Sequence, residues 1–351
     1  MSQEKNSSIT PALVAKSALL KPEEAVELAL EHYGLTVSAH RLSGEKDSNF
    51  RIRTEAGADY LLKVVSPGED PAVTNMHTLA LRHVAQRDPG MPVQRVVPDL
   101  QGRGDFEIVC SPGDRRTVRL VTFTKGALQR KTPQTARQRR NIGAMLARLQ
   151  LALEDFRHPA EGHFSTWDLQ NAQSLRPMIA QIENPSQVAE LLSWIDRFAE
   201  EVEPQSSLLR AQIVHNDLNS DNVVVDPQAT DQVAGIIDFG DMVHTPVMFD
   251  VAVAAAYQLT EADDPLAAAC EFLSGFHEKR PLLSEEIDLL FTTIITRMVM
   301  RIAITEWRAA RFPENRSYIL RNTPQAWIQF HRLTQISHSQ ANDTIARALS
   351  L

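Results

Sequence analysis

Three polar residues in the second half of the chain have the types and spacing that phosphoryl transfer requires. Asp217 and Asn222 belong to the pattern H-x-D-x-x-x-x-N, and Asp238 begins a D-F-G triplet sixteen residues later. Apolar runs lie between Asn222 and Asp238, so a hairpin would bring their side chains to the same end of a β-ribbon. An amide oxygen beside a carboxylate suits Mg²⁺ carrying nucleotide phosphates. Asp217 can accept or orient the proton of a substrate hydroxyl in the same site.

A lysine in the N-terminal third could contact the nucleotide. Lys63 lies within the apolar run Tyr60–Val65, where an isolated charge needs a partner or a ligand, and phosphate oxygens would serve. The polar turn before it includes Ser43, Gly44 and Asn49, and its backbone amides could line the phosphates. The alternative interpretation is that Lys63 only protects an edge strand from aggregation.

The elements that must position these residues change in character along the chain. We expect residues 1–20 to be loosely structured, a β-rich lobe with one main helix over 21–122, and a mostly helical lobe over 123–351. This is an α+β arrangement with a cleft between the lobes. Two glycines in the segment 99–105 predict a hairpin turn there. Apolar spacing predicts helices over 22–33, 71–86, 133–153, 175–182, 188–202, 248–258, 265–278, 284–311 and 323–338.

The composition excludes several classes of function. The 351-residue chain carries 36 Lys and Arg against 44 Asp and Glu, a net charge of -8, which argues against nucleic acid or an anionic membrane as the main partner. Its two cysteines, Cys110 and Cys270, give no support for a disulfide framework or a cysteine-based zinc site. The N-terminal residues do not resemble a signal peptide, and no run is long and apolar enough to span a bilayer. We therefore expect a cytoplasmic protein, and a homodimer is compatible with the sequence.

The polar motifs resemble those of known phosphotransferases. The H-x-D-x-x-x-x-N and D-F-G pair resembles that of protein kinases and, in detail, that of the aminoglycoside phosphotransferase family. The segments GEKDSNFRI, YLLKV and HNDLNSDN are most similar to the hydroxylysine kinase-like branch of that family. The similarity extends over roughly residues 23–329, which is most of the chain.

The resemblance implies a bilobal protein-kinase-like fold and a role for each matching residue. Asp217 would be the catalytic base, and Asn222 and Asp238 would be the Mg²⁺ ligands. His215 would support the catalytic loop rather than take part in the reaction. Lys63 would orient the phosphates of the nucleotide.

The same resemblance implies that the cleft holds two small molecules. The backbone of the hinge near Val121 and Phe123 would hold the purine ring of ATP or GTP. Asp241, Glu306 and Trp307 could face an amine on the acceptor, through ion pairing and cation–π contact. The alternative interpretations are a turn role for Asp241 and ordinary helix packing for Glu306 and Trp307.

Two positions depart from the kinase pattern. The helix over 71–86 should present an acidic residue or an amide to Lys63, yet His77 stands near that place, so Glu69, Asp70 or the nucleotide alone would have to serve. Asn219 stands where protein kinases have Lys and many antibiotic kinases have His, which removes a cation near the transferred phosphoryl group.

The sequence therefore predicts a small-molecule kinase. It would transfer the γ-phosphoryl group of ATP or GTP to a hydroxyl of an amine-bearing metabolite, either a hydroxylysine-like amino alcohol or a hydroxy amino acid. An aminoglycoside kinase or a homoserine-type kinase is the alternative within the same class. From other classes, a catalytically weak pseudokinase that binds nucleotide and a metal-dependent phosphohydrolase remain as alternatives.

Overall fold

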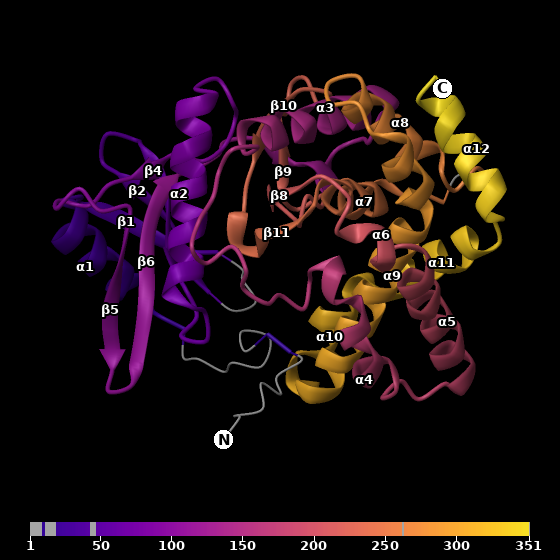
Figure 1. Cartoon of the computed structure of the whole chain (residues 1–351). Helices are drawn as coiled ribbons and strands as arrows, with labels where there is room; N and C mark the ends of the chain where they lie inside the picture. Colours follow the sequence, from indigo (N-terminus) through magenta and orange to yellow (C-terminus); the bar gives the residue numbers. More distant parts are fainter. Residues whose placement is uncertain (1–8, 11–18, 43–46, 262, 351) are drawn as a thin grey trace.

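The N-terminal region of the protein is an antiparallel sheet with two helices, drawn at the left of Figure 1. The computed structural model describes residues 9–10, 19–42, 47–261 and 263–350. The strands follow the order β1-β2-β3-β6, and β4 and β5 both pair with the other edge of β6. These elements are α1 (Pro22–Tyr33), β1 (Val37–Arg41), β2 (Ser48–Thr54), β3 (Asp59–Val64), α2 (Pro71–Arg87), β4 (Val96–Val97), β5 (Asp105–Ser111) and β6 (Asp114–Thr122).

The two faces of this sheet carry different residues. One face is apolar and packs on α1, and its fully buried side chains include Phe50, Ile52, Leu62 and Val64. Alternation along the strands places Asn49, Lys63 and Arg119 on the other face, where the pairs Asn49–Lys63 and Lys63–Arg119 lie directly opposite one another. The helix α2 contacts β4, β5 and β6 of the sheet as well as α3 of the helical region. The register of three strands therefore sets a row of polar residues at the side of the sheet that faces the rest of the protein.

The C-terminal region is mostly helical and is built around α9, a 28-residue helix whose side chains are largely buried. It contacts α4, α5, α7, α10, α11 and α12, so it forms the centre of this region (Figure 1). Its α-helices are α3 (Ala136–Ala152), α4 (Arg176–Ile179), α5 (Pro185–Glu201), α6 (Glu203–Ser206), α7 (Val247–Gln258), α8 (Ala267–His277), α9 (Ser284–Arg311), α10 (Arg316–Ile319), α11 (Thr323–Thr334) and α12 (His338–Ala348). Its strands and 3-10 turns are β7 (Ala127–Leu128), η2 (Gln129–Lys131), η3 (Leu169–Leu175), β8 (Ala211–Val214), β9 (Val223–Val225), β10 (Val233–Ile236), η4 (Phe239–Asp241), β11 (Val243–Pro246), η5 (Pro313–Asn315) and η6 (Leu320–Asn322).

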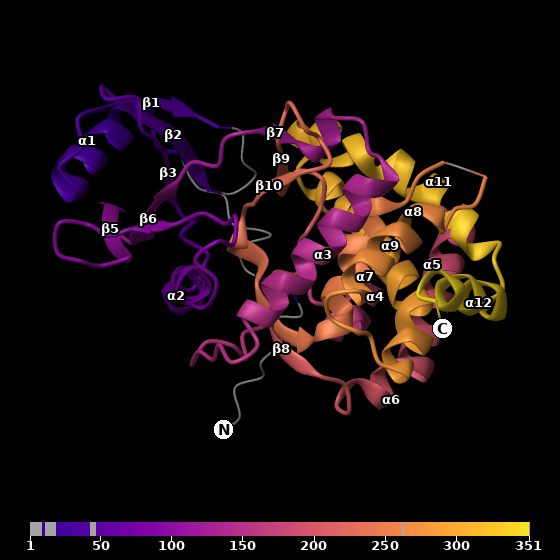
Figure 2. The ribbon, with the colours of Figure 1, turned by 90° about the horizontal axis from the view of Figure 1, so that it is seen from above.

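The two regions are joined by backbone contacts next to β10. Figure 2 shows the β7, β9 and β10 strands between the N-terminal sheet and the helices. The segment before β4 reaches β10 through a parallel bridge between Val93 and Ile236, and the Ile236 N–H donates to the carbonyl of Pro92 at 2.9 Å. A Cβ on Gly235 would lie 2.3 Å from the side chain of Thr124, so only glycine allows the segment after β6 to pass this closely. The junction therefore brings three chain segments together at the strand that precedes Asp238.

The structure confirms the predicted fold class and corrects some of the predicted elements, among them the helix predicted over 175–182, of which only α4 is α-helical. The fold is α+β, with an antiparallel N-terminal sheet and a helical C-terminal region. The predicted hairpin turn over 99–105 is wrong, because β4 and β5 pair with β6 rather than with each other. The single helix predicted over 323–338 is also wrong, since α11 ends at Thr334 and α12 begins at His338. The lobe limits at residues 122 and 123 stay a prediction, and most of the segment 1–20 lies outside the described residues. No helix among the described residues combines the length and apolar character needed to cross a membrane.

Candidate active site

The catalytic loop, residues 215–222, connects β8 to β9. The Nε2 atom of His215 donates to the carbonyl of Ile237 at 3.1 Å, and its Nδ1 atom accepts from the Asp217 N–H at 3.3 Å. Burial lowers the pKa of His215, and a neutral ring is the form that can donate with one nitrogen and accept with the other. His215 therefore links the loop that carries Asp217 to the segment that ends at Asp238.

Two residues of the site have left-handed backbone conformations. Asn216 has φ 63° and Asp238 has φ 60°, a region that costs non-glycine residues on the order of 1–3 kcal/mol. The Asn216 N–H is held by the buried Asp250, whose Oδ1 accepts it at 2.7 Å while Oδ2 accepts from Gln150 Nε2 at 2.8 Å. Burial raises the pKa of Asp250. The hydrogen bond to the buried Asp250 thus helps to hold Asn216 in its strained conformation, and such strain is common at functional sites.

Asp217 is held in place by amide and guanidinium groups. Its Oδ2 accepts from Asn219 Nδ2 at 2.9 Å and from Asn222 Nδ2 at 2.8 Å, and its Oδ1 lies 3.5 Å from Nη2 of Arg297. Burial and the negative charge of Asp241 raise the pKa of Asp217 to about 8, against the opposing effect of Arg297. A carboxyl group with a raised pKa is a better proton acceptor than an exposed one, which suits it to receive a proton from an alcohol.

Asn222 and Asp238 meet at one end of the β9–β10 hairpin, as predicted. The Ile237 N–H donates to the Asn222 carbonyl at 3.0 Å, so Asp238 follows directly. The Nδ2 atom of Asn222 donates to Asp217, which leaves the Asn222 amide oxygen for a ligand. The charge of Lys63 holds the pKa of Asp238 well below its usual range, so this side chain is a carboxylate.

This donor set fits Mg²⁺. In the portion of the chain that the structure describes, no group of three or more His, Cys, Asp or Glu residues could hold a metal ion by itself. Mg²⁺ in kinases needs only one or two protein oxygen ligands, because nucleotide phosphates and waters complete its shell. Asn222 and Asp238 would hold it in this site.

Lys63 lies between two carboxylates. Its Nζ atom is 2.9 Å from Asp47 Oδ2 and 3.2 Å from Asp238 Oδ1. Burial alone would lower the pKa of Lys63, but the carboxylates of Asp238 and Asp47 outweigh it and raise that pKa. Asp70 does not serve Lys63, because its side chain caps α2 by accepting from the Ala72 N–H at 2.8 Å. Asp47 therefore takes the place that an acidic residue on α2 was expected to fill.

Two further basic residues are buried near Lys63. His77 on α2 is 3% exposed and Arg119 on β6 is 4% exposed. Burial lowers the pKa of both side chains, and the charges of Arg119 and Lys63 lower that of His77 further. Within the described residues, His77 Nε2 and Arg119 Nη1 have no hydrogen-bond partner. A neutral histidine thus lies where kinases commonly have an acidic partner for the lysine.

Of the other residues predicted to contact the nucleotide, three lie on or next to strands of the N-terminal sheet. Ser43 and Gly44 lie outside the described residues. Asn49 shares a row with Lys63, and its buried Oδ1 has no partner in the described residues. Val121 is buried near the end of β6, and Phe123 follows that strand with its N–H donating to the Asp59 carbonyl at 3.1 Å.

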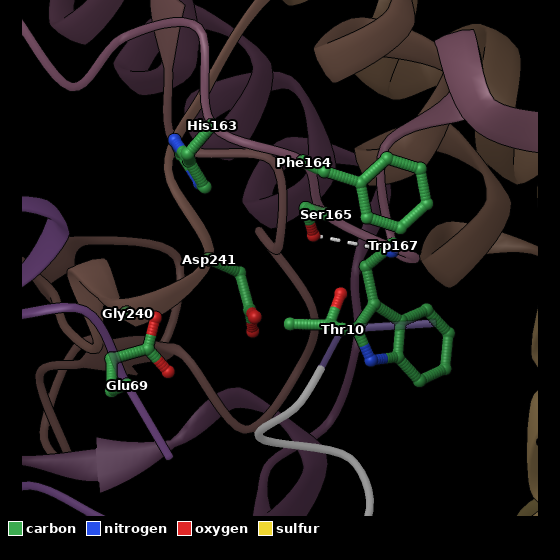
Figure 3. Close-up of a pocket in the computed structure, with 8 residues that line it drawn as sticks. All are labelled: Thr10, Glu69, His163, Phe164, Ser165, Trp167, Gly240 and Asp241. Atoms are coloured by element: carbon green, nitrogen blue, oxygen red, sulfur yellow. Dashed lines mark hydrogen bonds between the residues drawn. The ribbon is translucent and has the colours of Figure 1, made fainter. Parts of the chain in front are cut away.

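A pocket opens beside the D-F-G segment. Figure 3 shows Asp241 pointing into it, with Trp167 and Thr10 on the opposite wall. Glu306 and Trp307 do not line this pocket. Trp307 is 2% exposed within the core, and Glu306 lies near the charges of Arg316 and Glu183.

Sequence reasoning missed some residues that the structure brings to the site. Arg297 contacts Asp217 from α9, and Trp167 lies against Arg297 from the loop before η3. Neither belongs to a local motif, so only the tertiary fold brings them to the loop. Asp47 could have been found, because a carboxylate in the polar turn beside the strand of Lys63 is an obvious ion-pair candidate.

Comparisons with known proteins agree with this geometry. The chain is 27% identical to hydroxylysine kinase of Mus musculus over 337 residues, covering 88% of each chain. It is 30% identical to homoserine kinase of Neisseria meningitidis serogroup B over 248 residues, covering 69% of this chain and 74% of the relative. The solved structure of a microcompartment-associated aminopropanol kinase has a TM-score of 0.67 at 19% identity, covering 93% of this chain and 98% of that one. The model of the phosphotransferase enzyme family, APH, matches residues 38–281, and the protein therefore belongs to this family of kinases that act on small-molecule hydroxyls.

Proposed function

We propose that the protein transfers the γ-phosphoryl group of ATP or GTP to a hydroxyl group of an amine-bearing metabolite. The observation that carries this proposal is the meeting of Asp217, Asn222 and Asp238 at one end of the β9–β10 hairpin, with Lys63 3.2 Å from Asp238. A base, two hard oxygen ligands and a phosphate-binding cation are the components that in-line phosphoryl transfer needs.

In this mechanism Asp217 holds the acceptor hydroxyl and receives its proton. The bond between the acceptor oxygen and the γ-phosphorus forms as the bond between that phosphorus and the β–γ bridging oxygen breaks, and the nucleoside diphosphate leaves. Lys63 binds nucleotide phosphate oxygens, and Arg297 stabilises the carboxylate form of Asp217. Mg²⁺, held by Asn222 and Asp238, would neutralise charge on the phosphates.

An amine-bearing acceptor is supported by the pocket beside the D-F-G segment. Asp241 lines it and would pair with an ammonium group, and the ring of Trp167 lies on its opposite wall. The relatives named hydroxylysine kinase and homoserine kinase both act on acceptors that carry an amine and a hydroxyl. We therefore favour these hydroxy amino acids and related amino alcohols over an aminoglycoside.

A panel screen tests this proposal. The purified protein is incubated with Mg²⁺-ATP or Mg²⁺-GTP and each of a set of hydroxy amino acids, amino alcohols and aminoglycosides, and nucleoside diphosphate release is measured. We expect turnover with at least one amine-bearing alcohol and none with the matching compound that lacks the hydroxyl. A thermal shift with Mg²⁺-nucleotide but no turnover across the panel would instead favour a pseudokinase, a result that His77 and Asn219 would help to explain.

A further inference from the structure

Two arginines on α9 lie beside the acceptor end of the site. Arg297 is 1% exposed and Arg301 is half-buried. They are four residues apart, so they lie on one face of the helix about 6 Å apart along its axis. Both guanidinium groups lie over the ring of Tyr257, at 5.8 Å for Arg297 and 4.4 Å for Arg301. The two cations therefore form one positively charged surface rather than two separate ones.

The carboxylates near these arginines do not balance their charge. Among the described residues, Arg297 has one carboxylate contact, to Asp217 Oδ1 at 3.5 Å, and its Nε has no hydrogen-bond partner. Arg301 pairs with no carboxylate among the described residues, and its Nη1 contacts the sulfur of Met298 at 3.4 Å, a weak acceptor. Burial lowers the pKa of Arg301, and the charge of Arg297 lowers it further. Cations removed from water are normally paired, so these two guanidinium groups keep hydrogen-bonding capacity that suits an anionic group of a ligand.

This positively charged surface lies next to the pocket beside the D-F-G segment. Arg297 Nη1 donates to the carbonyl of Trp167 at 2.9 Å, and its guanidinium lies 5.0 Å from the centre of the Trp167 ring. Trp167 also lines the pocket that contains Asp241 (Figure 3). The charge of Asp217 acts on Arg301, and that of Asp241 acts on Asp217. Asp241 and Arg301 thus place opposite charges within electrostatic reach of the carboxyl group that would hold the acceptor hydroxyl.

We propose that Arg301, supported by Arg297 and Tyr257, binds a carboxylate of the acceptor, so that the substrate is a hydroxy amino acid rather than a simple amino alcohol. The inference rests on the proposed function and specifies its substrate class. A planar guanidinium binds a carboxylate through two parallel hydrogen bonds, which gives both affinity and orientation. With the carboxylate at Arg301 and the ammonium near Asp241, the hydroxyl would be directed to Asp217.

Matched acceptors test this inference. L-Homoserine and 3-aminopropan-1-ol have the same hydroxyl and amine and differ by the carboxylate, as do 5-hydroxylysine and 1,5-diaminopentan-2-ol. The kcat/KM ratio within each pair is measured for wild type, Arg301→Met, Arg301→Lys and Arg137→Met. Arg137 is an exposed arginine on α3, so its variant makes the same chemical change away from the site.

We expect wild type and Arg137→Met to prefer the carboxylated member of at least one pair. Loss of a charge-assisted contact should reduce that ratio by about 10- to 100-fold in Arg301→Met, with partial recovery in Arg301→Lys. Equal losses for both members of a pair would overturn the inference, since they would indicate a structural role or contact with the transferred phosphoryl group. A wild-type protein that shows no preference for the carboxylate would overturn it as well.

A binding measurement separates failure of the inference from failure of the proposed function. Thermal shifts are recorded with each of the four acceptors in the presence of Mg²⁺ and a non-hydrolysable nucleotide analogue. A shift with a carboxylated acceptor that is larger than with its partner, and that is lost in Arg301→Met, supports the carboxylate site even when no phosphoryl transfer occurs. Equal shifts within both pairs contradict the site even when transfer is observed.

Discussion

Buried charge is arranged differently on the two sides of the site. On the nucleotide side, which consists of Asp47, Lys63, His77, Arg119 and Asp238, the lysine lies within 3.2 Å of two carboxylates. On the acceptor side, the arginines at positions 297 and 301 have one carboxylate between them among the described residues, at 3.5 Å. The lysine of the nucleotide side is thus paired directly by carboxylates of the chain, whereas on the acceptor side Arg301 pairs with no carboxylate in the described part of the chain. An unpaired charged side chain favours a ligand group of opposite charge, whereas a paired one must exchange its partner before it can bind a ligand.

The largest expected effect is a loss of turnover on the acceptor side that leaves nucleotide binding on the other side unchanged. Replacing the base in Asp217→Ala should lower kcat by about 10³-fold or more, because the acceptor hydroxyl loses its proton acceptor. Nucleotide affinity should change little, since Lys63 and Asp238 keep their contact. Turnover and nucleotide binding are measured on the same preparation, with Asp196→Ala as the control, because Asp196 is an exposed residue of α5 that pairs with Arg176 on the surface. Near-normal turnover in Asp217→Ala would contradict the mechanism.

The second prediction concerns the ion pairs of Lys63 on the nucleotide side. Asp238→Ala removes a proposed Mg²⁺ ligand and one of the two carboxylates at Lys63. We expect affinity for the Mg²⁺-nucleotide to fall by about 100-fold or more, since even indirect ligand partners change metal affinity 10- to 100-fold. Thermal shift titrations with and without Mg²⁺ measure the change. If Mg²⁺ strengthens nucleotide binding equally in Asp238→Ala and wild type, Asp238 is not a ligand.

The third prediction concerns Asp250 of α7, which accepts a hydrogen bond from the catalytic loop. Asp250→Ala leaves the Asn216 N–H and Gln150 Nε2 without their buried acceptor. The free energy of unfolding should fall by about 2–3 kcal/mol, measured by urea denaturation. Asp250→Asn keeps an acceptor for the Asn216 N–H and should lose less. Equal losses in the two variants would mean that packing, rather than hydrogen bonding, holds the loop.

The smallest effect concerns the pH dependence of stability through His77. Its pKa is lowered in the folded protein, so below an unfolded-state pKa of about 6.5 the unfolded chain binds a proton that the folded chain does not. This group therefore contributes less stability as pH falls, by up to about 1.4 kcal/mol for each pH unit below that value. His77→Gln lacks this titration, so the stability advantage of wild type over the variant should shrink between pH 7 and pH 5. An advantage that is constant with pH would show that His77 titrates alike in both states.

Local patterns were sufficient to predict much of the fold. The N-terminal proline and the terminal glycine of α1, and the apolar spacing of α9, predict these helices closely because capping and periodicity are properties of short segments. The break between α11 and α12 was missed, although Ser337 and Gln340 form a capping box that marks a new helix start. The pairing of β4 and β5 with β6 could not be predicted, since a turn sequence does not specify which strand its neighbours join.

The site was predictable only where its residues share a motif. Asp217, Asn222 and Asp238 are brought together by one loop and one hairpin, and their spacing in the sequence reflects this. Arg297 is 80 residues away from Asp217 in the sequence, and a helix interior rich in apolar residues gives no sign that one face meets the catalytic loop. Contacts of this kind depend on how the helices pack.

The bridge between Val93 and Ile236 has a mechanical consequence. Together with the hydrogen bond from the Ile236 N–H to the Pro92 carbonyl, it attaches the N-terminal region to Ile236, which directly precedes the Ile237–Asp238 pair. Any rotation between the two regions that keeps these contacts must pivot near this point. Groups close to a rotation axis are displaced least. Asp238 would therefore keep its position, while the far ends of the sheet and of α9 would be displaced further. An opening of the proposed nucleotide site about this pivot would therefore leave in place the carboxylate on which metal binding is proposed to depend.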